Sequence, residues 1–251
     1  MPDDILYSYG WRLPFLASFV LFLVAMFVRR MVNESPEFTE SLEKDKEKVK
    51  APVKEVLTKV PKLLLLTIGA NVIGIAGFYF TNTFMLAYTT SFLSMPRGVV
   101  LDALFLVAIG QFLTMPIFAL IAERVGVHLF LVISSGLCII FPYAMFSMVD
   151  TGSVIMITLG VGLCHWTLSG CYANIAGFVT SLYPPRMRYS GISMAYQFSG
   201  AIFGAITPLI GTALAQKYSG DWMPLAIFFS VISFITMASF LGLNPKRNTT
   251  Y

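Results

Sequence analysis

The sequence predicts an all-α membrane protein with seven transmembrane helices. Seven apolar runs of about 20 residues follow one another along the chain, and this is the length that a helix needs to cross the hydrocarbon core of a bilayer. Hydrophobic residues make up 57% of the sequence and charged residues only 12%, whereas soluble domains average about a quarter charged residues. A soluble fold would have too little polar surface to cover itself, so lipid is the expected solvent.

The apolar runs are joined by short loops, except after the first run. They give the expected spans Leu13–Met31, Leu63–Ala87, Val99–Ala122, Leu129–Ser147, Val154–Thr180, Gly191–Ala215 and Met223–Leu243. If the chain begins outside the membrane, 14 of its 17 lysines and arginines lie in cytoplasmic segments. Only Arg12, Arg97 and Lys217 then fall on the other side. The positive-inside rule therefore places the C-terminus, with the tail 244–251, in the cytoplasm.

A proline pair ends the fifth apolar run. Pro184 and Pro185 interrupt the helix because proline lacks the backbone N–H and restricts the residue before it. Arg186 and Arg188 are expected to hold the following turn in water, and Ser190 to cap the sixth run. The two runs and their basic turn form a helical hairpin whose turn faces the cytoplasm.

The residues around this turn resemble a known family. The residues concerned are Arg186, Arg188, Tyr189, Ser190, Gly191, Tyr196 and Gln197. Their arrangement resembles the loop between the tenth and eleventh spans of major facilitator transporters, in particular the metabolite:proton symporter branch. That branch contains permeases for shikimate, α-ketoglutarate, citrate and proline or betaine.

Two further segments carry the same resemblance. Residues 10–38 contain Gly-Trp-Arg-Leu-Pro-Phe and Glu-Ser-Pro-Glu-Phe, which resemble the start and end of the family's sixth span. Residues 122–128 resemble its cytoplasmic loop Ala-Asp-Arg-x-Gly-Arg-Arg, with Val127 and His128 replacing the last two arginines. The resemblance implies that Glu123, Arg124 and the basic turn residues Arg186 and Arg188 form a cytoplasmic gate of ion pairs.

The resemblance also implies a domain plan. Residues 1–31 correspond to an outer loop and a sixth span, and residues 63–243 to the C-terminal six-helix bundle, with 244–251 as a cytoplasmic tail. Residues 32–62 form a charged, then amphipathic, cytoplasmic linker. In it, an apolar stripe at Val53, Val56, Leu57 and Val60 predicts a short helix on the inner membrane surface.

Polar residues inside spans are costly and mark candidate sites. Asn71 and Asn82 are eleven residues apart, which is about 20° beyond three turns at 100° per residue, so we expect them on one face with Tyr79 beside it. They either line the central cavity or form hydrogen bonds between helices.

His165 is the only ionisable residue deep in the predicted spans. It is a candidate for proton coupling and substrate binding, since histidine titrates near neutral pH. The alternative is a neutral histidine bonded between helices. Trp166 either stacks on a substrate or packs. Asp102, near the outer end of the third span, is a second coupling candidate.

In the sixth span, Tyr196 and Gln197 are expected to point to the cavity. Gly200 and Gly204 form a pair of small residues that favours close helix packing. Gln111, in the third span, is expected to bond between helices.

No enzyme activity, cofactor or metal is expected. The sequence shows no serine–histidine–acid set, phosphate-binding glycine loop or pair of close carboxylates. Cys138, Cys164 and Cys171 lie in apolar runs without metal-ligand spacing and are interpreted as packing residues. No nucleic-acid motif is present.

The expected function is proton-coupled symport of a small organic acid or zwitterion by alternating access, in a bacterial inner membrane. The resemblance covers the family from its sixth span onward, so the chain is expected to need a missing N-terminal half, and to be inactive alone. The alternative is a truncated or split membrane polypeptide with a structural or assembly role, or with no activity of its own.

Overall fold

The computed structural model describes residues 3–31 and 52–243. Contacts between residues divide the chain into two units, Met1–Lys48 and Val49–Tyr251. All regular secondary structure in the described ranges is helical, as the sequence predicts. The charged stretch 40–50 of the predicted linker lies outside the described residues.

The described residues of the first unit, 3–31, form one long helix with a short helical entry. It consists of α1 (Asp3–Ser8), the 3₁₀ turn η1 (Gly10–Arg12) and α2 (Leu13–Met31). The Arg12 guanidinium lies 4.9 Å from the centre of the Trp11 ring, a cation–π geometry. Pro14 falls in the first turn of α2, where its missing N–H has no helical partner to lose.

The second unit contains the linker helix and six membrane-length helices. It comprises α4 (Pro52–Lys59), α5 (Pro61–Val72), η2 (Ile73–Gly77), η3 (Phe80–Phe84), α6 (Met85–Ser91), α7 (Arg97–Val125), α8 (Val127–Val149), α9 (Val154–Leu182), α10 (Pro185–Ser199), η4 (Gly200–Gly204), α11 (Ala205–Lys217) and α12 (Met223–Gly242). The elements α5 to α6 form one continuous span, and α10 to α11 form another.

The seven predicted spans are confirmed. In the described residues seven helices are long and apolar enough to cross a membrane: Gly10–Met31, Pro61–Ser91, Arg97–Val125, Val127–Val149, Val154–Leu182, Met187–Lys217 and Met223–Gly242. Most extend a few residues beyond the predicted bounds because polar residues at their ends continue the helix. The change of direction between α7 and α8 needs only Gly126, whose φ of +99° favours glycine.

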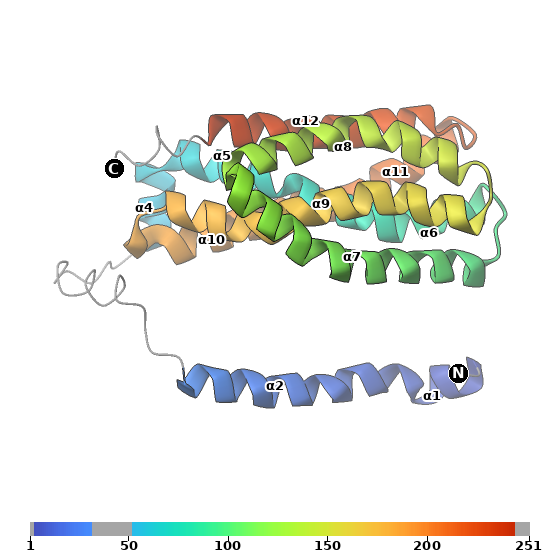
Figure 1. The fold of residues 1–251 in the computed structure, drawn as a ribbon, viewed down its shortest axis with the longest axis horizontal. Helices are drawn as coiled ribbons and strands as arrows, with labels where there is room; N and C mark the ends of the chain where they lie inside the picture. Colours follow the sequence, from blue (N-terminus) through green and yellow to red (C-terminus); the bar gives the residue numbers. More distant parts are fainter. Residues whose placement is uncertain (1–2, 32–51, 244–251) are drawn as a thin grey trace. The chain divides into compact units, whose positions relative to one another are not determined.

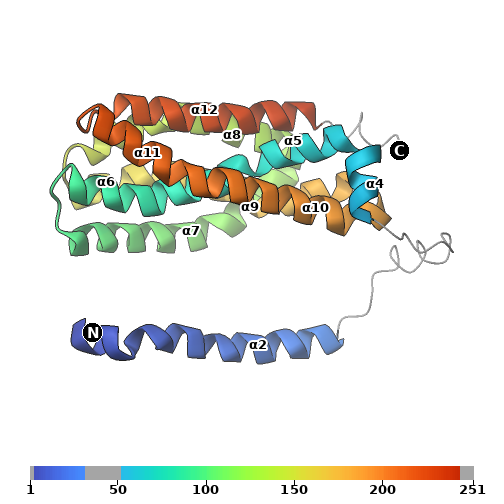
Figure 2. The same ribbon diagram turned by 180° about the vertical axis from the view of Figure 1, so that it is seen from behind.

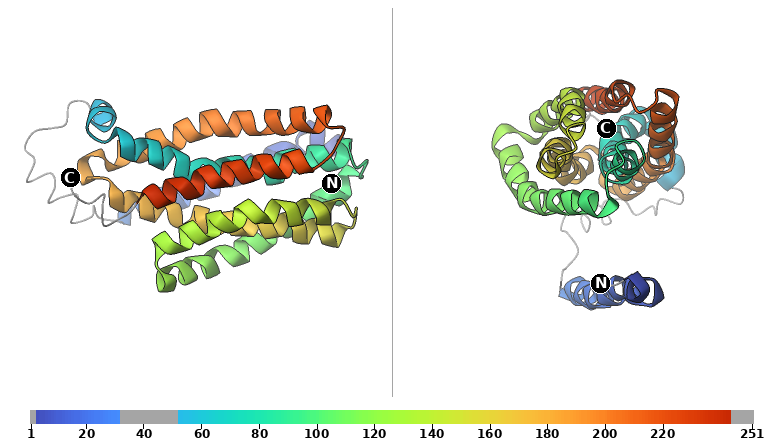
Figure 3. Two further views of the ribbon diagram at one scale, coloured as in Figure 1. Left: turned by 90° about the horizontal axis from the view of Figure 1, so that it is seen from above. Right: turned by 90° about the vertical axis from the view of Figure 1, so that its right-hand side faces the viewer.

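Helix α9 is central in the second unit. It packs against α7 and α8, while α12 packs against α8 and α5, and α10 against α5 and α4. Figure 1 shows α8 and α12 side by side above α9, with α7 below it. Figure 2 shows the same unit from behind, with α10 and α11 in orange nearest the viewer. The end-on view in Figure 3 shows these helices packed as a bundle.

The second unit has three π-helical segments in its described residues, η2, η3 and η4. The first has a visible cause. The Ile73 N–H donates to Thr236 Oγ1 at 3.1 Å, and that hydroxyl donates to the Gly69 carbonyl, also at 3.1 Å. Thr236 of α12 therefore stands where a direct bond from Ile73 to Gly69 would close an α-helical turn.

Close packing at Gly204 is confirmed. A Cβ atom there would lie 3.2 Å from both Ile75 Cγ2 and Tyr79 Cε2, a tight contact that these two side chains would have to shift to accommodate. It brings η4 against η2. Two of the three π-helical segments thus meet directly.

The start of the sixth span differs from the prediction. Helix α10 begins directly at Pro185, with Pro184 as the residue before the helix. Ser190 lies inside α10, so its predicted role as a cap is wrong. Proline at the first helical position explains the early start, because this position needs no N–H and favours the φ of proline.

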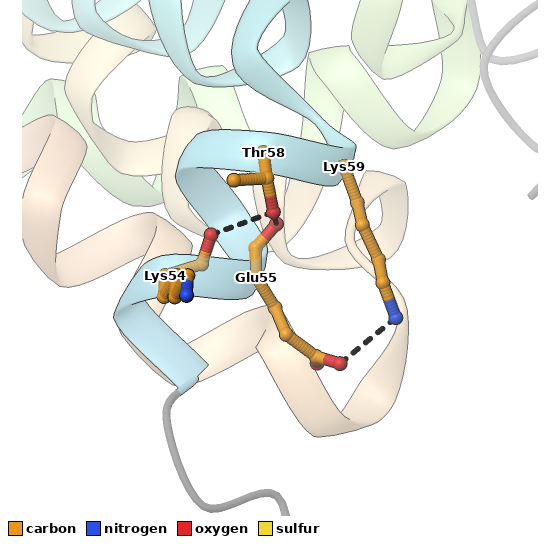
Figure 4. A network of polar contacts seen from close by, with 4 residues as sticks. All are labelled: Lys54, Glu55, Thr58 and Lys59. Atoms are coloured by element: carbon orange, nitrogen blue, oxygen red, sulfur yellow. Dashed lines mark hydrogen bonds and ion pairs between the residues drawn. The ribbon is translucent and has the colours of Figure 1, made fainter.

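Helix α4 confirms the predicted short linker helix and shows where its apolar stripe lies. Val56 and Val60 are buried in a core cluster together with Tyr183 and Phe240 of the bundle, whereas Val53 and Leu57 remain exposed. Half of the stripe therefore packs on protein. On the outer side Lys59 Nζ lies 2.8 Å from Glu55 Oε1, and the Thr58 hydroxyl donates to the Lys54 carbonyl at 2.8 Å (Figure 4).

Candidate functional site

Two adjoining cavities lie among the spans of the second unit. The first, which we call the Asn71 cavity, has a volume of about 340 Å³ and is lined by Asn71, Tyr172, Ile175, Ala176, Val179, Ile192, Ser193, Tyr196 and Gln197. The second, the Gln111 cavity, has a volume of about 280 Å³ and is lined by Gly74, Ile75, Phe78, Tyr79, Gln111, Leu168, Ser169, Tyr172 and Tyr196. Both cavities are thus bounded by α9, α10 and the span that runs from α5 to α6.

Tyr172 and Tyr196 belong to both cavities and separate them. Their phenol groups interact with each other, from α9 and α10 respectively. Phe78, Tyr79 and these two tyrosines are each between 42% and 45% exposed, so their rings face open space. Aromatic faces of this kind bind cationic groups as well as apolar ones.

No residue that lines either cavity carries a formal charge. Hydrogen bonds are available from hydroxyl groups and from the amides of Asn71, Gln111 and Gln197. The Asn71 amide already donates to the Thr67 carbonyl at 2.8 Å, which fixes its orientation and leaves its second N–H and its oxygen for another partner.

His165 lies behind the Gln111 cavity, 2% exposed. Its Nε2 atom is 3.0 Å from Gln111 Oε1 of α7. Its Nδ1 atom is 2.8 Å from Thr81 Oγ1 and 3.4 Å from Asn82 Nδ2, both on η3. The imidazole therefore joins three spans, and Gln111 connects it to the cavity.

The second candidate in α9, Trp166, lies elsewhere. Its indole N–H donates to the Val107 carbonyl of α7 at 2.9 Å. A Cβ at Gly110 would lie 2.5 Å from the Trp166 ring, so the ring rests on the α7 backbone. Trp166 does not line either cavity.

Asn71 and Asn82 are not brought together. Asn71 lines the first cavity, whereas the Asn82 amide donates to the Phe78 carbonyl at 3.0 Å and faces His165. The expectation of one shared face assumed a regular helix. The π-helical segment η2 lies between these residues and η3 contains Asn82, and each widened turn changes the direction in which later side chains point.

The other candidates lie at the ends of the spans. Asp102 is exposed on α7, away from both cavities. Glu123 and Arg124 are exposed at the end of α7, and within the described ranges neither forms an ion pair. Arg186 and Arg188 fall in the first turns of α10, where Arg188 is half-buried.

His128, which stands where the family loop has an arginine, contacts a neighbouring span. Its Nε2–H donates to the Phe240 carbonyl near the end of α12 at 2.8 Å, and its ring lies 5.6 Å from that of Phe178. This histidine therefore ties α8 to α12.

Three roles at the site were not identified from the sequence: those of Thr81 and Gln111 as partners of His165, and that of Ser193 in the lining of the Asn71 cavity. Sequence reasoning named Gln111 only as a bond between helices, and it singled out neither Thr81 nor Ser193. Ser169 and Tyr172 follow His165 at i+4 and i+7, and this spacing on one helix face does indicate their place in the Gln111 cavity. Among the described residues, no group of three histidine, cysteine or acidic side chains could hold a metal ion.

Comparison with known proteins identifies the family. The model of the Major Facilitator Superfamily matches residues 5–204. The shikimate transporter of Escherichia coli (strain K12) is 30% identical over 236 residues, which cover 90% of this chain and 52% of that protein. No solved structure gives a significant match.

Two further relatives agree. The inner membrane metabolite transport protein YhjE of Escherichia coli (strain K12) is 28% identical over 99% of this chain and 57% of its own length. The glycine betaine/proline/ectoine/pipecolic acid transporter OusA of Dickeya dadantii (strain 3937) is 27% identical over 96% of this chain and 49% of its own. The chain thus spans about half the length of the curated relatives it matches, and it belongs to the Major Facilitator Superfamily.

Proposed function

We propose that this chain provides the C-terminal half of a proton-coupled carrier for a small organic acid or zwitterion. The observation that carries the proposal is the pair of uncharged, aromatic-lined cavities with a buried histidine behind them that is bonded to two neighbouring spans. A cavity between spans suits alternating access, because each side of the membrane can be reached when the helices around it move.

The lining favours a substrate that carries a carboxylate and is small. Amide and hydroxyl groups of Asn71, Ser193, Tyr196 and Gln197 can donate hydrogen bonds to carboxylate oxygens. The exposed face of Tyr79 and of the two shared tyrosines can hold an ammonium group of a zwitterion. The names of the relatives, which include shikimate, proline and glycine betaine, agree with this chemistry.

The other candidate residues receive roles in the cycle. His165 takes up the coupled proton, with Asp102 as a second coupling group at the outer end of α7. The gate at the opposite, cytoplasmic end is formed by Glu123, Arg124, Arg186 and Arg188. Attraction between the carboxylate and the guanidinium groups favours its closed state. Trp166 holds α7 against α9 through its bond to Val107.

The cavities also indicate why a second half is needed. Their aromatic rings are nearly half exposed, so a substrate bound there would be covered on one side only. We propose that an N-terminal half, on the same polypeptide or on a separate one, covers the other side in the bacterial inner membrane. The second candidate function, a split product with only an assembly role, rests on the half-length match to the relatives.

The test begins with the native product. A C-terminally tagged form is extracted from its own membranes, and its intact mass and any co-purifying polypeptide are measured. This native form and the 251-residue chain are then reconstituted separately in liposomes. We expect saturable uptake of labelled shikimate, proline or glycine betaine by the native form, driven by an inward proton gradient and abolished by a protonophore. Uptake by the 251-residue chain alone would refute the need for a second half, and no uptake by either form would favour the assembly role.

The role of His165 is tested in the active form. His165→Gln is expected to reduce gradient-driven uptake at least tenfold while substrate counterflow, which needs no net proton movement, continues. His128→Gln is the matched control and should leave gradient-driven uptake nearly unchanged. Loss of counterflow and uptake together would instead place His165 in substrate binding or in folding.

A further inference from the structure

The Thr81 hydroxyl lies within hydrogen-bond distance of two groups that can each accept its hydrogen. Its Oγ1 atom is 2.8 Å from the Gly77 carbonyl oxygen and 2.8 Å from His165 Nδ1. A hydroxyl group has one hydrogen. It can donate to the carbonyl or to the imidazole nitrogen, but not to both at once.

The proton on His165 decides between these two arrangements. Gln111 Oε1, on the far side of the ring, accepts a hydrogen bond from Nε2–H. In the neutral ring the proton therefore sits on Nε2, Nδ1 is bare, and Thr81 donates to it. In the protonated ring Nδ1–H donates to Thr81 Oγ1, and the Thr81 hydrogen turns to the Gly77 carbonyl.

The backbone around Thr81 is shaped for this contact. Thr81 and Asn82 are adjacent in sequence, yet both reach the same ring nitrogen, whereas neighbouring residues of a regular α-helix point in different directions. They lie in the π-helical segment η3, and Gly77 is the last residue of η2. Single π-helical turns of this kind often occur at functional sites.

We propose that Thr81 is a relay that passes the protonation state of His165 to the Gly77 carbonyl. Through that carbonyl the state reaches the part of the span that lines the Gln111 cavity, at Gly74 and Ile75 of η2 and at Phe78 directly after it. The inference rests on the proposed function, in which His165 takes up the coupled proton. Thr81 is a positioning residue, since it acts through His165 and does not line a cavity.

When His165 is protonated, its own positive charge is the main charge near the ring. No charged side chain of the described residues interacts with the ring or lines the cavities. The packed elements carry charged or titratable groups toward their ends, Arg97, Asp102, Glu123 and Arg124 on α7, His128 on α8 and Arg188 on α10, and none of these lines either cavity. Within the spans the titratable groups include the thiols of Cys138 on α8 and of Cys164 and Cys171 on α9, and the phenols of Tyr79, Tyr172 and Tyr196 in the cavities.

The sequence offers a direct readout of the Gly77 carbonyl. The dipeptide Gly-Phe occurs only at Gly77–Phe78 and Gly177–Phe178. Labelling glycine carbonyl carbons with ¹³C and phenylalanine nitrogens with ¹⁵N therefore gives two signals in a carbonyl–amide correlation spectrum. A Cβ atom placed at Gly177 would have no neighbouring heavy atom within 4 Å, so Gly177 lies in open space and serves as the internal reference. Gly177→Ala assigns the pair.

The same samples report on the imidazole. The sequence has two histidines, so ¹⁵N-histidine spectra of the 251-residue chain in lipid nanodiscs contain two rings, assigned with His128→Gln and His165→Gln. The Gly77 carbonyl shift is then followed as a function of the protonated fraction of His165. We expect the shift to change in proportion to that fraction in the wild type and in Thr81→Ser, and to stay constant in Thr81→Val. In His165→Gln, which has no ring at this position, the shift should stay constant over the same pH range.

Thr89→Val is the matched control. Thr89 is buried in the same span and its hydroxyl donates to the Met85 carbonyl at 2.8 Å, with no histidine nearby. This variant should keep the Gly77 response. If the ring titrates while Gly77 stays constant, or responds equally in Thr81→Val, the relay is wrong and the coupling role of His165 stands. If the ring does not titrate, both are wrong.

Discussion

His165 shows how a single side chain can be restrained by groups far apart in the sequence. Its partners Thr81 and Gln111 are 84 and 54 residues away. Each ring nitrogen has a partner, and this satisfies a polar group that lipid and apolar side chains could not. The two site candidates in α9 therefore differ. His165 bonds to Gln111, which lines a cavity, whereas Trp166 bonds to the backbone of the neighbouring helix α7.

The indole of Trp166 is expected to act on stability. Trp166→Phe removes the hydrogen bond to the Val107 carbonyl and should lower the free energy of unfolding by about 1 kcal/mol. Trp222→Phe, which keeps an aromatic ring stacked on Phe146, is the control. Thermal unfolding in detergent measures both variants, and substrate affinity is measured on the reconstituted native form. Weaker substrate binding at unchanged stability would return Trp166 to the substrate site.

Tyr183 predicts a dependence of stability on alkaline pH. It lies between two spans, 2% exposed, and its hydroxyl donates to Thr67 Oγ1 at 3.2 Å. Burial raises the pKa of the Tyr183 phenol above its usual value of about 10, against the smaller opposing effect of the Thr67 bond. The folded state therefore favours the neutral phenol, and this contribution is fully present below about pH 10 and lost as the pH rises through the folded pKa.

Melting temperatures between about pH 8 and pH 11 test this sign. The wild type should lose stability more steeply than Tyr183→Phe, which has no phenol to ionise at this position. Tyr189→Phe, at a residue that is 85% exposed, should follow the wild type. An equally steep loss in Tyr183→Phe would contradict the assignment.

At the scale of elements, the span from Pro61 to Ser91 is the least regular. It contains two π-helical segments, and the partners of both come from other spans: Thr236 of α12 at η2, and His165 of α9 at η3. Side chains inserted into the helical hydrogen-bond pattern widen its turns. At η2 the shape of this span is therefore imposed by a neighbour, the Thr236 side chain of α12.

Thr236→Val tests that statement. The variant removes the hydroxyl that bridges the Ile73 N–H and the Gly69 carbonyl, so either two buried groups lose a partner or the turn must close. We expect a loss of about 1–3 kcal/mol in the free energy of unfolding. Thr207→Val is the control, because the buried Thr207 hydroxyl bonds only within its own helix, to the Phe203 carbonyl. Equal effects of the two variants would show that the bridge contributes nothing specific.

For the whole molecule, the charges predict one orientation in the membrane. Consecutive spans are joined by short loops, so Lys59, Arg124 and Arg188 lie toward one end of the bundle and Arg97 and Lys217 toward the other. From the positive-inside rule we expect the first end to be cytoplasmic. Substituted cysteines report this, since the three native cysteines are buried.

We expect Thr151→Cys, in the exposed turn between α8 and α9, to react with a membrane-impermeant maleimide on intact cells. Lys59→Cys and Arg124→Cys should react only after the cells are opened. The reverse pattern would invert the topology and would remove Arg124 and Arg188 from the proposed cytoplasmic gate.

The sequence alone determined the spans, their number and the family resemblance. Apolar length is a local property of about 20 consecutive residues, and the motifs at residues 10–38 and 183–197 are likewise continuous segments. Even the early start of α10 follows from a local rule, the preference of proline for the first helical position.

The tertiary structure decided which polar residues meet. The partners of His165 come from two other spans, and Trp166 points to α7 because Gly110 leaves room for its ring. Asn71 and Asn82 part because Thr236, more than 150 residues away, opens a turn between them. A pattern of 100° per residue describes an isolated helix. Which polar residues meet depends on side chains that neighbouring helices contribute, and the periodicity of one helix carries no information about those side chains.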